Sequence, residues 1–240
     1  MTDKKSFFEA VSEKPYRNIF IALVFTILIE TVAPSSIGRG KFSDLMLAVV
    51  LVAALIETVR ARRNAIVALV LGLPAVILRV ISAFTADSPV MNTTLISVTA
   101  LFLGFLIWNL LQDLSKSGRP TSERIFGALC AYVFVGLLFA LLFAHMEYRH
   151  PGSFSISQPM VASAAADEAN LYPDFTYFSF VTLTTLGYGD ITPVAKQART
   201  LAWFEALIGQ LYLAVMVAGF VALHISERIQ GNRGDGPPDG

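Results

Sequence analysis

Hydrophobic residues dominate six long stretches of the chain, and short polar segments separate these stretches. A helix needs about 20 mostly apolar residues to cross the core of a bilayer, so each stretch predicts one transmembrane helix. A seventh apolar piece, 174–185, is too short to span and lies between the last two stretches. We therefore expect an all-α membrane protein with six transmembrane helices and one short re-entrant helix. The six stretches are residues 17–34, 44–60, 64–84, 93–112, 123–146 and 199–226.

Basic residues lie unevenly on the two sides of these stretches. Lysine and arginine accumulate in cytoplasmic loops, and here they precede the first stretch, follow the second, separate the fourth from the fifth and follow the sixth. The opposite loop, 85–92, has none. We therefore expect a multi-pass protein of a plasma (inner) membrane with both termini in the cytoplasm. The residues that indicate this topology are Lys4, Lys5, Lys14, Arg17, Arg60, Arg62, Arg63, Lys116, Arg119, Arg124, Arg228 and Arg233.

The composition agrees with a membrane protein. Of 240 residues, 55% are hydrophobic and 15% are charged, whereas soluble domains carry about 25% charged residues. The formal net charge is zero, and no basic block indicates a nucleic-acid partner. The single cysteine, Cys130, cannot form an intramolecular disulfide and is expected to be a small buried hydrophobe.

The short apolar piece leads into the polar sequence Thr-Leu-Gly-Tyr-Gly-Asp at 185–190. A protein that removes water from K⁺ must replace the water oxygens, and rings of backbone carbonyls do so in potassium channels. Aiming successive carbonyls inward requires positive φ at alternate residues, which Gly187 and Gly189 adopt at little cost. The Thr185 hydroxyl can join the innermost ring, while Tyr188 points outward. A helix over 174–184, started by Pro173 and Asp174, would direct its negative end toward the ions.

The twelve residues Thr182 to Pro193 resemble the pore loop of tetrameric potassium channels. This resemblance covers about 123–226 and weakens over the first four helices. It implies a homotetramer in lipid, since one loop cannot close a ring. It also implies passive K⁺ transport without a cofactor or enzymatic activity. Leu186 and Val181 depart from the family, in which many members carry valine and glutamate there. The residues expected to form the filter are Thr185, Leu186, Gly187, Tyr188 and Gly189, and the first four of these are expected to coordinate K⁺.

The resemblance also suggests a division of the chain. The first four helices match a voltage-sensor domain in number, and the remainder matches a pore domain. The segment before the first helix fits an interfacial helix and a frayed terminus equally well. The expected parts are a cytoplasmic segment 1–16, a four-helix membrane domain 17–112, a pore domain 113–226 (outer helix 123–146, turret 147–173, pore helix 174–184, filter 185–190, inner helix 199–226) and a disordered cytoplasmic tail 227–240.

Four residues are expected to support the filter: Asp190, Tyr177, Thr184 and Glu205. The resemblance implies that Tyr177, on the pore helix, bonds Asp190. Glu205 lies roughly 9 Å below the outer end of its helix at 1.5 Å per residue. A carboxyl group at this depth needs a hydrogen-bond partner or a proton. We expect Glu205 to hold the pore helix rather than to bind ions.

The last helix carries the candidates for a hinge and a gate. Gly209 follows Gly189 by twenty residues, which resembles the spacing of the family's hinge glycine, although close helix packing explains a glycine equally well. Residues at helical spacing beyond it are expected to line the pore, or to form an ordinary packing stripe. These gate candidates are Leu213, Val217, Phe220 and Val221.

Two other functions are compatible with the same pattern. The first is a nonselective cation channel with a loosened filter, and Tyr188 argues against it. The second is a non-conducting scaffold or regulatory subunit with a vestigial filter, and the intact filter sequence argues against that. Flux of K⁺ from loaded liposomes, blocked by barium, distinguishes these functions.

The first prediction concerns voltage. Residues 93–112 contain no arginine or lysine. We expect Arg79 to pair with Glu30 or to share a water pocket with it, since both lie roughly 20 Å above the cytoplasmic ends of their helices. Even if Arg79 crossed the whole field, four subunits would gain roughly 9 kcal/mol per 100 mV, against about 28–37 for a true sensor. Open probability should therefore vary weakly with voltage in planar bilayers. An effective gating charge above about four per tetramer would contradict this expectation.

Overall fold

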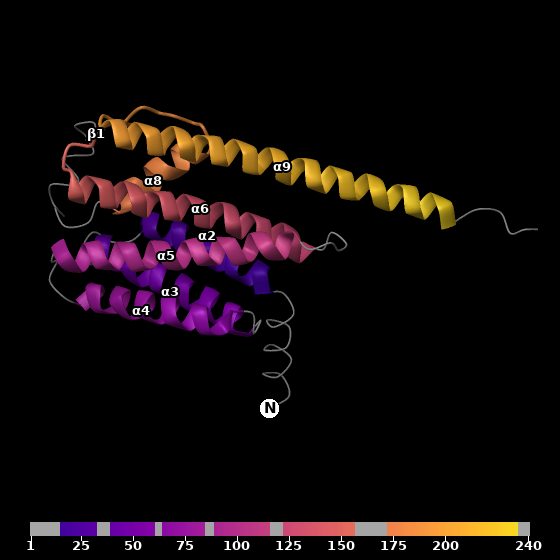
Figure 1. Ribbon diagram of the computed structural model, residues 1–240, viewed down its shortest axis with the longest axis horizontal. Helices are drawn as coiled ribbons and strands as arrows, with labels where there is room; N and C mark the ends of the chain where they lie inside the picture. The colour runs from indigo at the N-terminus through magenta and orange to yellow at the C-terminus, as the bar shows by residue number, and fades with distance from the viewer. Residues whose placement is uncertain are drawn as a thin grey trace, which may run out of the picture.

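In the computed structural model the described part of the chain, 15–32, 39–60, 64–84, 89–115, 122–156 and 172–234, is almost entirely helical. Figure 1 shows α9 along one edge of the bundle, α6 and α8 beside it, and α3 and α4 on the far side. The helices are α2 (Pro15–Val32), α3 (Arg39–Arg60), α4 (Ala65–Phe84), α5 (Pro89–Leu114), α6 (Ser122–Arg149), α8 (Tyr172–Leu183) and α9 (Lys196–Gly234), with strands β1 (Phe154–Ile156) and β2 (Ile191–Pro193). The predicted all-α class is confirmed.

Within the described residues, four helical segments are long and apolar enough to cross a membrane. They are Ala65–Phe84, Met91–Leu114, Glu123–Arg149 and Lys196–Val221, and they correspond to the last four predicted spans. Tyr16–Ile29 is a shorter apolar helix. A count of six transmembrane helices therefore stays a prediction.

Helix α6 lies at the centre of the bundle. It packs against α2 and α5 on one side and against α8 and α9 on the other. Its inward faces are apolar, and Cys130 is a free cysteine that is fully buried among them. Near its end, Phe143 contacts Phe154 of β1 and Phe178 of α8 edge to face, with ring centroids 5.6 and 5.0 Å apart. This aromatic cluster joins α6, α8 and β1.

The strands lie beyond the outer end of α6. They pair antiparallel, with Phe154 opposite Pro193. The Glu147 carboxylate accepts hydrogen bonds from the backbone N–H groups of Gly152 (2.7 Å) and Phe154 (3.1 Å). Glu147 therefore shapes the turn that leads from α6 into β1 and so fixes the start of the hairpin.

The start of α2 is tied to the ends of two other helices. The backbone N–H of Tyr16 donates to Glu123 of α6 at 3.0 Å, and the Tyr16 hydroxyl donates to Asp113 of α5 at 3.1 Å. Pro15 lacks an N–H but loses nothing in the first turn of a helix. The predicted interfacial helix within 1–16 lies almost wholly outside the described residues.

The element boundaries differ from prediction mainly at the C-terminus. The predicted inner helix ended at 226, but α9 starts at Lys196 and continues to Gly234. The prediction of a disordered tail is therefore wrong for residues 227 to 234. Glu227, Arg228 and Gln230 favour helix, and no proline lies between Glu227 and Pro237. The outer helix continues to Arg149 and the pore helix spans Tyr172–Leu183. Most of the predicted turret, 157–171, lies outside the described residues.

Candidate functional site

The loop between α8 and β2 has an alternating backbone. Its φ angles are positive at Thr185 (59°), Gly187 (62°) and Gly189 (80°). This alternation turns successive peptide groups in the same sense, so that their carbonyls can share one side of the loop. Glycine accepts positive φ readily, whereas threonine does so at a cost of about 1–3 kcal/mol. The sequence did not predict the conformation of Thr185.

Hydrogen bonds hold Thr185 in this conformation. Its backbone N–H donates to the Thr182 carbonyl at 2.9 Å, and its hydroxyl donates to the Thr184 carbonyl at 2.7 Å. Its hydroxyl oxygen also accepts from the Gln210 side-chain amide of α9 at 3.0 Å. Gln210 is not among the residues predicted from the sequence to support the filter, although it directly follows Gly209. The hydroxyl of Thr184, the first residue after α8, donates to the Phe180 carbonyl at 2.6 Å.

The next residues of the loop are fastened to the last turn of α8. The N–H groups of Leu186 and Gly187 both point to the Val181 carbonyl, at 2.9 and 3.4 Å. The last carbonyls of a helix lack partners inside the helix, and here the loop folds back to supply them. The loop therefore starts at a defined position against the negative end of α8.

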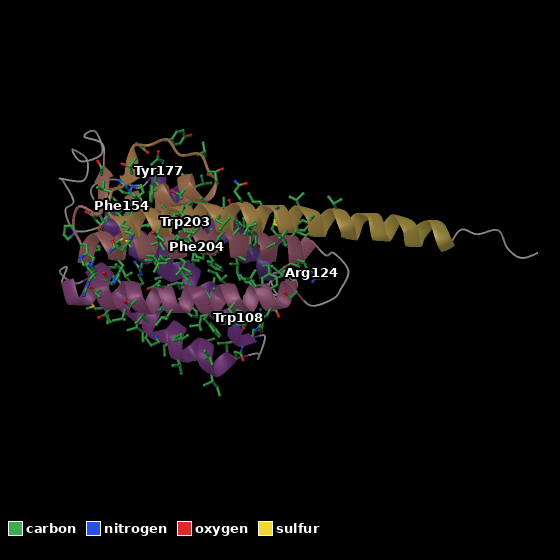
Figure 2. The ribbon with its side chains drawn as sticks, turned by 45° about the horizontal axis from the view of Figure 1, so that its top comes forward. Trp108, Arg124, Phe154, Tyr177, Trp203 and Phe204 are labelled. Atoms are coloured by element: carbon green, nitrogen blue, oxygen red, sulfur yellow. The ribbon has the colours of Figure 1, made fainter. Side chains whose placement is uncertain are left out.

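The outer end of the loop is held by Asp190. The Tyr177 hydroxyl of α8 donates to one carboxylate oxygen at 2.6 Å, and the N–H of Ile191 donates to the other at 3.1 Å. The bond to Asp190 raises the pKa of Tyr177 to about 12. Val181 is buried, so this position supplies no carboxyl group near Asp190. Figure 2 shows Tyr177 and Phe154 at one end of the bundle, with Trp108 and Arg124 toward the other.

Behind the loop, Glu205 and Ser179 connect three helices. Glu205 of α9 is fully buried. The Ser179 hydroxyl of α8 lies within hydrogen-bond distance of the Glu205 carboxyl and of the Gly136 carbonyl of α6, the latter at 2.7 Å. A hydroxyl has one proton to donate. When Ser179 donates it to Gly136, the link to Glu205 requires a proton on the carboxyl group. Glu205 thus contacts α8, and its side chain does not line the loop.

Gly209 lies directly against the end of α8. A Cβ atom at this position would overlap the Leu183 carbonyl oxygen and lie 3.1 Å from the Leu183 carbonyl carbon. The same carbonyl accepts a hydrogen bond from the Tyr132 hydroxyl of α6 at 3.3 Å. The structure therefore gives Gly209 a role in close packing, while a role as hinge stays a prediction.

The gate candidates do not share one environment. Val217 and Val221 are 55% and 52% exposed, and Leu213 is half-buried. Phe220 lines a groove between α9, α5 and α6. Phe220 thus lies apart from the face that Val217 and Val221 present.

The predicted Glu30–Arg79 pair falls partly outside the described residues, because the side chain of Glu30 is not among them. Arg79 is described and is almost fully buried, at 2% exposure. Its guanidinium carbon lies 5.4 Å from the ring centroid of Tyr172, the first residue of α8.

Comparison with known proteins assigns the family. The profile of the family described as "Ion channel" matches residues 128–224. Protein LctB of Bacillus caldotenax is 35% identical over 122 residues, which cover 50% of this chain and 87% of LctB. The rice two pore potassium channel c is 33% identical over 86 residues, 36% of this chain and 19% of that protein. The inward rectifier potassium channel Kirbac3.1 of Paramagnetospirillum magnetotacticum is 34% identical over 88 residues, 35% of this chain and 24% of that protein.

These matches define an integral membrane protein that transports ions and is not an enzyme. The chain belongs to the family of Protein LctB, its residues 128–224 match the ion channel family, and other relatives are named as potassium channels. The profile covers α6 from Ala128, α8, the loop and most of α9, so the matched residues contain every filter and gate candidate. No solved structure matches the chain.

The contact between Gly209 and Leu183 generates a prediction. Gly209→Ala should displace the end of α8, lower the stability of the detergent-solubilised protein by about 1–3 kcal/mol and reduce K⁺ flux in liposomes. Gly219 is the matched control, because a Cβ there meets nothing within 4 Å. Gly219→Ala should leave flux unchanged and melt slightly higher, since alanine favours helix over glycine by about 0.5–1 kcal/mol. Equal effects of the two substitutions would show that the contact is unimportant.

The hydrogen bond between Tyr177 and Asp190 generates a further prediction. Tyr177→Phe removes one hydrogen bond, which contributes about 0.5–1.5 kcal/mol net, so current should decline several-fold faster during long pulses or block by external ions should change. Val181→Ala, in the same helix, should affect packing and leave the decline near that of the wild type. Planar-bilayer recordings measure both. Currents from Tyr177→Phe that match the wild type throughout would count against a supporting role for this bond.

Proposed function

We propose that this chain is one subunit of a potassium-selective channel that conducts K⁺ passively as a homotetramer. The observation that carries this proposal is the alternation of positive φ at Thr185, Gly187 and Gly189 in a loop held at both ends. A backbone of this kind presents carbonyl oxygens at regular intervals along one line. Such oxygens can replace the hydration shell of a cation that enters the membrane.

The coordination follows from the residues of the loop. The carbonyls of Thr185, Leu186, Gly187 and Tyr188 supply the rings, and the Thr185 hydroxyl adds the innermost one. That hydroxyl donates to Thr184 and accepts from Gln210, which leaves one lone pair of its oxygen for a cation. The negative end of α8 points toward the same region and offsets part of the cost of desolvation. No cofactor takes part, since K⁺ is the permeant ion.

A ring of oxygens around an ion needs several copies of the loop. Four copies around a central axis agree with the family resemblance. They also agree with the closed rotational symmetry that most homo-oligomers have. The surface of α9 supports an assembly, because it exposes a long row of apolar side chains that includes Leu211, Val215 and Val217, at 57%, 71% and 55%. In the tetramer this row faces neighbouring subunits, lipid or the ion pathway.

The remaining helices complete the proposal. With α2 and α3 counted as spans, each subunit crosses the membrane six times and both termini lie in the cytoplasm of a cell with this channel in its plasma (inner) membrane. Helices α2 to α5 form a peripheral domain that serves assembly, lipid contact or a stimulus other than voltage. The rival functions, a nonselective cation channel and a non-conducting scaffold, have no specific support from the loop geometry.

The proposal predicts the behaviour of the two filter glycines. Gly187→Ala and Gly189→Ala force a side chain into positive φ, which costs about 1–2 kcal/mol per residue, and should abolish potassium-selective flux while the protein still assembles. Gly152→Ala is the matched control, since Gly152 also has positive φ (87°) and open space around its Cα but lies outside the loop. Gly152→Ala should keep wild-type selectivity.

Reversal potentials in mixed K⁺ and Na⁺ measure selectivity, and barium block of flux from K⁺-loaded liposomes shows whether conduction occurs at all. Unchanged selectivity in both filter variants would overturn the assignment of the filter. Absence of barium-sensitive flux in the wild-type protein would favour the scaffold, and equal passage of K⁺ and Na⁺ would favour the nonselective channel.

A further inference from the structure

Arg79 occupies an unusual position for a cation. It is the only charged residue of α4, in the sequence from Ala65 to Phe84, and only 2% of its surface is exposed. Arginine carries a positive charge in proteins. A buried charge needs a compensating environment, and the side chain must reach it from an otherwise apolar helix.

Part of that environment is the ring of Tyr172. The guanidinium carbon lies 5.4 Å from the ring centroid, within the range of a cation–π interaction. Tyr172 is 5% exposed, and such contacts are stronger when both groups are away from water. The contact joins the peripheral domain to α8, because Tyr172 is the first residue of that helix.

The other end of α8 holds the filter loop. Helix α8 has 12 residues and is therefore about 18 Å long at 1.5 Å per residue. At its C-terminal end, Leu186 and Gly187 donate to the Val181 carbonyl, and the Leu183 carbonyl lies against Gly209. A short helix transmits displacement along its length with little bending, so a shift at Tyr172 moves the groups that fix the loop.

Helix α4 is built in two parts. In the first part, Gly72 lies so close to α5 that a Cβ would be 2.7 Å from the Phe102 ring. Arg79 lies in the second part, and Pro74 separates the two. A proline inside a helix removes one hydrogen bond and favours a bend at that point. The half of α4 that carries Arg79 therefore begins at the point of the helix where a hydrogen bond is missing.

We propose that Arg79 is a positioning residue for the selectivity filter, acting through its contact with Tyr172 and the length of α8. The arrangement of the peripheral four-helix domain then sets the geometry of the filter, and with it ion selectivity. The selectivity readout rests on the proposed function as a potassium channel. The mechanical part, that Arg79 steadies α8, does not depend on conduction.

The test uses the full-length protein in liposomes, with four variants and one control. Arg79→Gln removes the charge, and Tyr172→Leu removes the ring. Each should lower the ratio of K⁺ to Na⁺ permeability by about tenfold. The loss of a desolvated cation–π contact changes an equilibrium constant by about that factor. Tyr172→Phe keeps the ring and should resemble the wild type, while Arg79→Lys keeps the charge and should rescue part of the ratio. Ile77→Ala, at an exposed position of the same helix (47%), should have no effect.

The double variant Arg79→Gln/Tyr172→Leu should be no worse than either single variant, because both remove the same contact. Additive effects, or a wild-type permeability ratio in Arg79→Gln, would overturn the proposal. If Arg79→Gln does not assemble, the permeability ratios of Tyr172→Leu and Arg79→Lys test the proposal in the same way. Loss of assembly or thermal stability in these variants with an unchanged ratio would indicate a structural role only.

Amide hydrogen exchange separates this proposal from the channel function. The amides of α8 should exchange about tenfold faster in Arg79→Gln and Tyr172→Leu than in the wild type, and at the wild-type rate in Tyr172→Phe and Ile77→Ala. This measurement needs no ion flux. If the wild type fails to conduct, the proposed function fails while exchange still tests the contact. Unchanged protection of α8 in Arg79→Gln would overturn the positioning role, whatever the flux.

Discussion

The contact between the end of α8 and Gly209 is the constraint on which the arrangement of α6, α8, α9 and the loop at 185–190 depends. The Leu183 carbonyl lies where any side chain at position 209 would stand, so the two helices meet through their backbones. Because the loop at 185–190 begins two residues later and is bonded to the last turn of α8, its position relative to α9 follows from this approach. Gln210, the next residue of α9, then reaches Thr185.

Three kinds of interaction hold α8 in this place. Phe143, Phe154 and Phe178 pack edge to face near its middle. Ser179 provides a polar link to α6 and α9 through otherwise apolar surroundings. Polar links are stronger where no water competes for their partners, and their directions are specific. Apolar packing alone tolerates small shifts of a helix. The Ser179 link and the Leu183 contact, by contrast, fix the position of α8 along its own axis.

The sequence predicted the order and type of the helices because long apolar runs have few alternatives in a membrane protein. It also predicted the positive φ of Gly187 and Gly189, since two glycines at alternate positions point to that conformation. The positive φ of Thr185 could not be predicted in this way, because its cost is offset by contacts with Thr184 and Gln210 that exist only in the folded chain. Arg79 is the clearest case, since its contact with Tyr172 joins residues that lie 93 positions apart.

The end of α9 was missed for a different reason. A glycine-rich tail reads as irregular structure, yet a helix already formed adds residues at small cost once its first turns exist. Hydrophobic periodicity reports the part of a helix that is buried in the membrane, and it does not report continuation beyond the membrane. For the same reason, sequence placed the gate candidates on one stripe, and only packing against α5 and α6 separated Phe220 from Val217 and Val221.

The burial of Cys130 has a practical consequence. It is the only cysteine of the chain, it is fully buried, and its sulfur lies 3.4 Å from the Tyr16 carbonyl as a hydrogen-bond donor. Thiol reagents act on accessible thiolates, so the native protein should be inert to them. A cysteine introduced at an exposed position would then be the single reactive thiol of the chain. Spin labels and fluorophores could be attached there without first removing a native residue.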